Sequence, residues 1–179
     1  MRFDRTKWKT ALDIVNSYRK EDLRRILLEY WEEPFCNQIS QKIVETRKKK
    51  KFETTKDLSD LIWSVSKFAK SKNRVFQALR IEVNNELENM ETSIKDGIDL
   101  LEKWWIIFVI SFHSLEDRIV KNIFRRESRD CICRDMVCTC KHTKVLKKLN
   151  KKPILPTEEE VKENSRSRSA KARFAEKIV

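Results

Sequence analysis

The chain has 179 residues, of which 40 are Lys or Arg and 28 are Asp or Glu, giving a formal net charge of +12 at pH 7. This length allows one ordinary domain, or a small domain with part of another. The longest apolar run, residues 104–110, falls short of the roughly 18 residues that span a bilayer, which excludes a membrane span. A surface this basic favours binding to polyanions, because binding releases their counterions. Nucleic acid is therefore the first partner to consider. A basic protein with no polyanion partner is the alternative.

The N-terminal sequence, MRFDRTKWKT, lacks the apolar segment of a secretory signal. We therefore expect a cytoplasmic protein whose five cysteines are reduced thiols or metal ligands. One glycine beside five tryptophans is an unusual composition, because average usage would give a chain of this length roughly a dozen glycines.

Roughly the first hundred residues have the pattern of amphipathic helices. Pro34 suits the first turn of the second long helix, Thr54 or Thr55 caps a later one, and a single long helix is predicted over about 74–101. Within residues 10–51 the apolar residues that recur at helical spacing are Leu23, Ile26, Leu27, Tyr30, Phe35, Ile39, Ile43 and Val44.

The pattern then changes. The sequence IIFVI at 106–110 is a short β-branched and aromatic run, typical of a strand buried on both faces, and it implies a parallel sheet. Ser114 begins a helix, with Asp117 three residues later to form a capping box. Further on, the sequence predicts strands over 144–149 and 170–178 and a short helix over 157–163.

Four segments resemble blocks of the RsmH (MraW) family, and they occur in the family's order. They are TALDIVNSYRKEDLRRILLEY at 10–30, VFQALRIEVNNELENME at 75–91, VISFHSLEDRIVKNIF at 109–124 and KKPILPTEEEVKENSRSRSAKARFAEKI at 151–178. One short motif would be weak support, but four long blocks in order cover most of the chain. On these blocks the chain is identified as a member of the family.

The resemblance implies an α/β fold, with the C-terminal half of a Rossmann-like class I methyltransferase core plus an inserted all-helical domain. Residues 1–74 would be the helical insert on the substrate and RNA side. Residues 75–179 would be the C-terminal part of the core, with a cysteine-rich loop at about 127–143. The activity implied is methylation, dependent on S-adenosylmethionine (SAM), of the N4 amino group of a cytidine in small-subunit (16S) ribosomal RNA. The partners implied are that RNA and the ribosomal subunit, without DNA or a membrane.

The family holds SAM with a GGGHS-type turn, an acidic residue after the second strand and a DLG-type segment, and none of these occurs here. The first residues, Met-Arg, match the family's internal LDMR segment. We therefore expect the SAM ligands to lie upstream of Met1, and this chain alone to be inactive.

Ligands of open α/β sheets bind beyond the carboxyl ends of the strands, which places Ser111, Phe112, His113 and Ser114 at the rim of a substrate cleft. Methylation requires the N4 lone pair to lie in line with the SAM methyl, and Phe112 or His113 is a candidate to stack on a flipped cytosine. The alternative is that these residues only pack and cap the turn, with Ser114 and Asp117 as the capping pair. The remaining cleft candidates, on the predicted long helix, are Arg80, Asn84 and Asn85.

A second candidate site is Arg166, Ser167, Arg168 and Ser169, where two guanidinium groups and two hydroxyls suit the binding of phosphate oxygens. Alternatively, these arginines anchor the last strand on neighbouring carboxylates. The family pattern ENPRSRSAK has proline where this chain has Ser165.

Four cysteines, Cys131, Cys133, Cys138 and Cys140, form a C-x-C-x4-C-x-C pattern that resembles a cysteine-rich insertion in part of the family. Four close thiols can ligate zinc tetrahedrally, with His142 as a substitute ligand. The spacing is tighter than the usual C-x2-C pairs, so a surface loop of reduced thiols is the other interpretation.

Trp8, Trp31, Trp104 and Trp105 stand where the family pattern has glycine. A helix-to-strand turn commonly needs a positive φ, which glycine adopts freely and a bulky aromatic residue does not. Some bacterial lineages read UGA as glycine and others as tryptophan. Our hypothesis is that these four residues are glycines read through the wrong code.

Two other classes of function stay open at this point. One is a stand-alone basic RNA-binding module without catalysis, and the other is a small zinc-stabilised protein associated with the ribosome. A methyltransferase part, inactive alone, is the leading interpretation because the four blocks are so specific.

Overall fold

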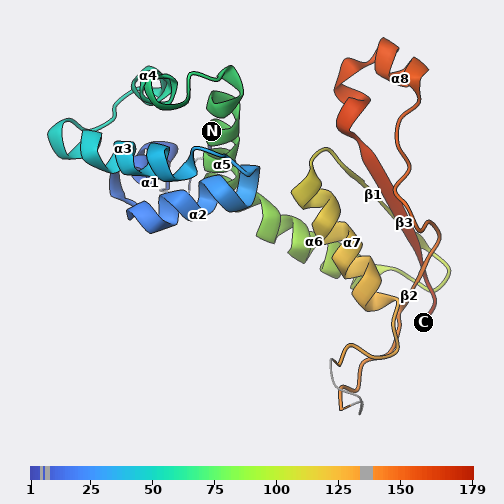
Figure 1. Cartoon of the computed structure of the whole chain (residues 1–179). Helices are drawn as coiled ribbons and strands as arrows, with labels where there is room; N and C mark the ends of the chain where they lie inside the picture. Colours follow the sequence, from blue (N-terminus) through green and yellow to red (C-terminus); the bar gives the residue numbers. More distant parts are fainter. Residues whose placement is uncertain (5, 7–8, 134–138) are drawn as a thin grey trace. The chain divides into compact units, whose positions relative to one another are not determined.

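A computed structural model describes residues 1–4, 6, 9–133 and 139–179 (Figure 1). The contacts divide the chain into two compact units, Met1–Glu86 and Leu87–Val179, and each is described by itself. In the described part of the chain, no helix is both long and apolar enough to cross a membrane.

In its described residues, the first unit has helices and no strands, as the sequence predicts. Two of its helices begin with capping boxes, in which Thr10 pairs with Asp13 and Thr54 with Asp57. Each box satisfies N–H groups that have no partner inside the helix. The five helices are α1 (Ala11–Ser17), α2 (Lys20–Trp31), α3 (Cys36–Lys49), α4 (Thr55–Ser66) and α5 (Ala69–Asn84).

The predicted apolar stripe forms the core of this unit. Leu23, Ile26 and Leu27 of α2 and Ile39 and Ile43 of α3 are all buried, and α4 and α5 add further aliphatic side chains. The stripe therefore faces inward, as amphipathic periodicity requires. The prediction for Pro34 is wrong by two residues, because α3 begins at Cys36 and Pro34 lies just ahead of the helix.

The long helix predicted over 74–101 is interrupted, which corrects the prediction. Helix α5 ends at Asn84, Asn85 adopts a left-handed conformation with φ 53°, and α6 (Glu86–Leu100) follows at once. Asparagine tolerates this conformation better than most residues, so a single residue stops one helix without disturbing the apolar periodicity on either side. The two units divide between Glu86 and Leu87, beside this break.

The second unit combines helices with a three-stranded sheet. Its strands are β1 (Ile106–Ser111), β2 (Leu146–Lys148) and β3 (Lys171–Lys177), in the order β1-β3-β2. Both pairings are antiparallel, with Phe108 opposite Phe174, so the prediction of a parallel sheet is wrong for these strands. The apolar run of β1 did not predict the strand direction, because the direction depends on a partner strand whose paired residues are 60 to 70 positions away in sequence.

The other helices of this unit include two at predicted positions, α7 (Ser114–Glu127) and α8 (Glu158–Glu163), and one that was not predicted. Helix α7 follows β1, α8 is capped by Thr157, and the short 3-10 helix η1 (Ser165–Ser169), the one not predicted, precedes β3. Strand β3 lies between the other two, so it holds the sheet together (Figure 1).

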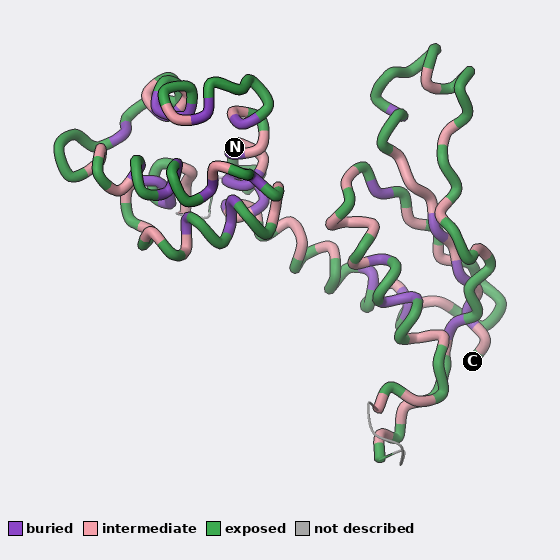
Figure 2. The backbone as a smooth tube through the Cα atoms, in the orientation of Figure 1, coloured by how far each residue is buried: buried purple, intermediate pink, exposed green. Residues whose placement is uncertain are grey.

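Among the described residues of the second unit, one face of this sheet is covered by helices and the other is not. Ile94 and Ile98 of α6 and Val120, Ile123 and Phe124 of α7 are buried in one cluster with Leu146 and Ala175 of the sheet. On the opposite face, Ile106, Phe108 and Ile110 are each at least half exposed, at 56%, 56% and 50%. Buried residues occur both in α7 and in the strands of the sheet (Figure 2), but the exposed side chains of β1 show that the expectation of burial on both faces is wrong for this chain.

Trp104 lies in the turn between α6 and β1 with φ 73°, a region that favours glycine. Its N–H donates to the carbonyl of Lys177 at 2.8 Å, and the N–H of Lys177 donates to the carbonyl of Trp105 at 2.8 Å. These bonds to β3 hold the turn in place. Of the other three tryptophans in glycine positions, Trp31 and Trp105 do not have positive φ, and Trp8 lies outside the described residues.

We predict that Trp104→Gly stabilises the protein by about 1 kcal/mol, because a non-glycine residue in the left-handed region costs about 1–2 kcal/mol and the exposed indole returns only part of that. Urea denaturation followed by circular dichroism measures the change. Trp105→Gly is the matched control and should give no gain, since its φ is not positive. Equal effects of the two substitutions would contradict the assignment of strain to position 104.

Candidate functional site

The predicted rim residues lie together at the end of β1 and the start of α7. Ser111 is buried, and its hydroxyl donates to the carbonyl of Lys171 at 3.3 Å. Phe112 is 53% exposed, and Ser114 is also exposed at the first position of α7. This segment therefore presents one aromatic ring and one hydroxyl to solvent, while Ser111 is the last residue of β1 and is bonded to β3.

His113, and not Ser114, caps α7, which corrects the predicted capping pair. The His113 ring accepts from the N–H of Glu116 at 3.5 Å, and the Glu116 carboxylate accepts from the N–H of Phe112 at 2.7 Å. Burial by itself would raise the pKa of Glu116, but hydrogen bonds from the His113 side chain and the Phe112 backbone lower it. An ionised Glu116 near the start of α7 also has a favourable interaction with the helix dipole.

Asp117 has a different partner from the one predicted. Arg173 of β3 forms a two-pronged contact with its carboxylate, with Nε to Oδ1 at 2.6 Å and Nη2 to Oδ2 at 3.1 Å. Both side chains are largely buried, at 9% and 13% exposure. The hydrogen bond from Arg173 lowers the pKa of Asp117, and burial opposes this only partly. Asp117 therefore ties α7 to the central strand.

The other cleft candidates belong to the first unit. Arg80 forms a two-pronged contact with Glu86 at 2.9 and 3.0 Å. The Asn84 side chain binds the carbonyl of Met1 and accepts from the N–H of Phe3, both at 2.9 Å, and Asn85 is the left-handed residue after α5. The structure therefore gives Arg80 and Asn84 structural contacts within or beside the first unit.

The predicted phosphate-binding residues form η1. Arg166, Arg168 and Ser169 are exposed, whereas Ser167 is buried and its hydroxyl donates to the carbonyl of Asn164 at 2.8 Å. Among the described residues, no ion pair to Arg166 or Arg168 is found, so the anchoring of β3 on carboxylates falls instead to Arg173. The two exposed guanidinium groups stay candidates for binding phosphate.

A basic hollow that sequence analysis missed lies along α7 and the segment after β2. It has a volume of about 230 Å³ and is lined by Lys121, Arg125, Lys148 and Lys151, together with the amide of Asn150. None of these four cations has an ion-pair partner within the described ranges. The spacing of Lys121 and Arg125, four residues apart on one helix, is the only local signal, since the other two cations join them through the fold.

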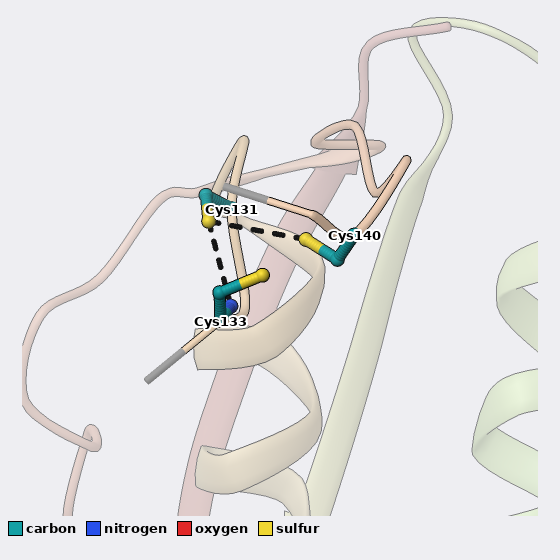
Figure 3. Close-up of side chains that lie close together, drawn as sticks. All are labelled: Cys131, Cys133 and Cys140. Atoms are coloured by element: carbon teal, nitrogen blue, oxygen red, sulfur yellow. Dashed lines mark hydrogen bonds between the residues drawn. The ribbon is translucent and has the colours of Figure 1, made fainter. Parts of the chain in front are cut away.

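Three of the four predicted metal ligands come together in the loop between α7 and β2 (Figure 3). The Sγ atoms of Cys131, Cys133 and Cys140 all lie within 4.8 Å of one another, and those of Cys131 and Cys140 are 3.8 Å apart. None of the three is in a disulfide. Cys138 lies outside the described residues.

Backbone N–H groups point at these sulfurs. Ile132 donates to Cys140 Sγ, and Thr139 donates to Cys133 Sγ, each at 3.4 Å. Hydrogen bonds from the backbone of Ile132 and then of His142 lower the pKa of the Cys140 thiol to about 6, and the bond from Thr139 lowers the pKa of Cys133. The His142 ring is directed elsewhere, with Nε2 3.2 Å from the carbonyl oxygen of Arg126.

Comparison with known proteins decides the family. A model of the MraW methylase family matches residues 1–178. The chain belongs to this family.

Curated relatives agree over the same length. The chain is 50% identical over 99% of its length to a protein of Persephonella marina and, to the same extent, to one of Caldicellulosiruptor saccharolyticus. A protein of Clostridioides difficile is 44% identical over 99% of the chain. All three are called ribosomal RNA small subunit methyltransferase H. The chain spans 58% of the first of these relatives and 60% of the other two.

We predict that Asp117→Asn destabilises the protein by about 2 kcal/mol at pH 7, because Arg173 is left buried without its charged partner. Since the folded-state pKa of Asp117 is lowered, the stability it adds is present above its unfolded-state pKa of about 4 and is lost as the pH falls through the folded value. Urea denaturation at pH 7 and near pH 3 should therefore show a gap between the two proteins that shrinks in acid.

The matched control is Asp130→Asn, which removes an exposed ion pair with Lys144 at 3.3 Å. Exposed pairs contribute little, so this change should cost less than about 1 kcal/mol at either pH. A loss for Asp117→Asn that is no larger than that of the control would contradict the role of Asp117 in joining α7 to β3.

Proposed function

We propose that this chain is the RNA-binding part of an enzyme that transfers the methyl group of SAM to N4 of a cytidine in small-subunit ribosomal RNA. The observation that carries the proposal is 50% identity across 99% of the chain to proteins called ribosomal RNA small subunit methyltransferase H. Because the 50% identity extends over nearly the whole chain, it supports a shared substrate as well as a shared fold. The chain covers 58–60% of these two relatives, and the proposal therefore concerns a part of the enzyme.

The second unit, in this proposal, is the C-terminal part of a Rossmann-like core that continues in a segment this sequence does not contain. The uncovered face of the sheet supports this, because Ile106, Phe108 and Ile110 expose a continuous apolar surface there. Phe108 also packs its ring against Phe174 of β3, with centroids 5.9 Å apart, which extends that surface across two strands. Apolar faces of this kind are normally covered by other elements of the same domain.

The residues that the structure describes offer no glycine-lined site for SAM. The one glycine, Gly97, lies within α6, and a Cβ atom added there would meet Ile107 at an ordinary 3.8 Å. Gly97 therefore does not mark a place where the backbone closely approaches a nucleotide. SAM supplies an electrophilic methyl group, and we place its binding residues in the segment outside this sequence, so this chain's part is to hold the RNA.

The exposed rim of β1 is the proposed site for the target base. Phe112 presents its ring at the carboxyl end of the strand, where stacking on a flipped cytosine would fix the base plane and the direction of the N4 lone pair. His113 is a weaker candidate for stacking, because its ring caps α7 and contacts Glu116 at 3.0 Å. The Ser114 hydroxyl lies beside Phe112 in sequence and is exposed, so it can hydrogen-bond an edge of the base or the sugar.

The RNA backbone, we propose, follows the cations of the second unit. The basic hollow offers Lys121, Arg125, Lys148 and Lys151 without competing carboxylates among the described residues. The exposed guanidinium groups of η1 add two further contacts. Contacts of this kind position nucleic acid and release counterions, which makes the affinity depend on salt.

We predict that the double variant Lys148→Ala and Lys151→Ala binds RNA more weakly and with a shallower dependence on salt. Each phosphate of a single strand that a cation neutralises contributes about 0.7 to the slope of log affinity against log salt, so removing two such cations should reduce the slope by about 1.4. The measurement is fluorescence anisotropy of the whole chain with a labelled, single-stranded, cytidine-containing oligoribonucleotide, repeated over a range of salt concentrations.

The matched control is the double variant Lys95→Ala and Lys103→Ala, which removes the same charge from exposed positions of the second unit that do not line the hollow. Its slope should stay close to that of the unchanged chain. Equal losses in the two variants would show that binding follows net charge and not the hollow, and would contradict the proposed RNA path. No salt-dependent binding at all would contradict the RNA-binding role itself.

A further inference from the structure

We propose that Cys131, Cys133 and Cys140 form a thiolate site for a zinc ion, which fastens the loop between α7 and β2. This inference is independent of the proposed methyl transfer, because it rests on the loop alone. No zinc site is implied by the family name or by the names of the relatives.

The spacing of the sulfurs fits tetrahedral zinc. Thiolates at about 2.3 Å from a tetrahedral zinc ion lie about 3.8 Å apart. The Sγ atoms of Cys131 and Cys140 are 3.8 Å apart, and all three sulfurs lie within 4.8 Å of one another (Figure 3). The third sulfur therefore needs to move by about 1 Å at most to complete the same geometry.

The backbone around the sulfurs favours thiolate over thiol. The N–H groups of Ile132, Cys133 and Thr139 donate to Cys140, Cys131 and Cys133 respectively, each at 3.4 Å. Each sulfur thus receives at least one amide hydrogen bond, which stabilises negative charge on a metal-bound thiolate. A loop of unrelated surface cysteines would not be expected to turn three amides toward three sulfurs.

The ends of the loop are already fixed, so a metal would close a defined ring. The N–H of Val145 donates to the carbonyl of Glu127 at 2.9 Å, and Lys144 pairs with Asp130 at 3.3 Å. The His142 ring lies against the end of α7, with Nε2 3.2 Å from the carbonyl oxygen of Arg126, which leaves the three thiolates as the described ligands. With three protein sulfurs, the fourth zinc position takes water or a further ligand.

The test is metal content and ligand type in the whole chain, purified under reducing conditions and reconstituted with zinc or cobalt(II). We expect one zinc per chain by mass spectrometry of the metal. We also expect the cobalt form to show the visible bands of tetrahedral coordination together with sulfur-to-metal charge transfer. Single variants Cys131→Ser, Cys133→Ser and Cys140→Ser should each weaken zinc binding at least about tenfold, because each removes one thiolate.

Cys36→Ser is the matched control. Because Cys36 is buried in the first unit and is not part of the cluster, this substitution should leave zinc binding unchanged. Circular dichroism shows whether each cluster variant folds. If one does not, the charge-transfer intensity of the cobalt form of the unchanged chain still gives the number of thiolate ligands. Three or four thiolate ligands to cobalt support the site, and two or fewer contradict it. Absence of bound metal after reconstitution, or a Cys131–Cys140 disulfide that persists under reducing conditions, would likewise overturn the proposal.

Discussion

The architecture of the second unit depends on β3, which lies between the other two strands and carries two largely buried cations on its covered face. Arg173 is neutralised by Asp117 of α7, and the Lys177 ammonium donates to the carbonyl of Ile98 in α6 at 2.9 Å. Charged groups inside a protein are tolerated only when they are paired or hydrogen-bonded. These two contacts therefore fix α6 and α7 on the same face of the sheet, and the other face is left apolar and uncovered.

That one-sided arrangement connects the fold with the proposed function. Because α7 begins directly after β1, the Asp117 contact that ties this helix to β3 also sets the rim of the strand, where Phe112 is exposed. The same helix contributes two of the four cations of the basic hollow. Under the proposed function, base recognition and backbone binding would then be positioned by one helix, and the bare face of the sheet would be the surface for a cofactor-binding segment.

Sequence analysis predicted what depends on local patterns. The apolar periodicity of residues 10–51 and the capping threonine Thr54 correspond to helices in the structure, and the cysteine spacing did bring three thiols together. The break at Asn85 was not predicted, because one left-handed residue leaves no trace in the periodicity.

Features that depend on distant residues were also missed or misjudged. Strand direction and the partner of Asp117 are set by β3, which lies more than 50 residues along the chain from Asp117. The basic hollow has the same origin, since Lys148 and Lys151 meet α7 only after folding. The left-handed turn at Trp104, by contrast, is where the family's glycine pattern and the backbone agree, and it supports the hypothesis of a misread glycine codon at that position.

The main proposal is that this chain holds the RNA for N4 methylation. The most direct test joins it to the N-terminal segment of the Caldicellulosiruptor saccharolyticus relative and measures N4-methylcytidine by mass spectrometry after incubation with SAM and small-subunit ribosomal RNA. We predict methylated cytidine from the joined protein and at least about a fivefold slower reaction with Phe112→Ala, since base stacking contributes about 1–3 kcal/mol. A joined protein that binds both SAM and RNA yet forms no N4-methylcytidine would contradict this role.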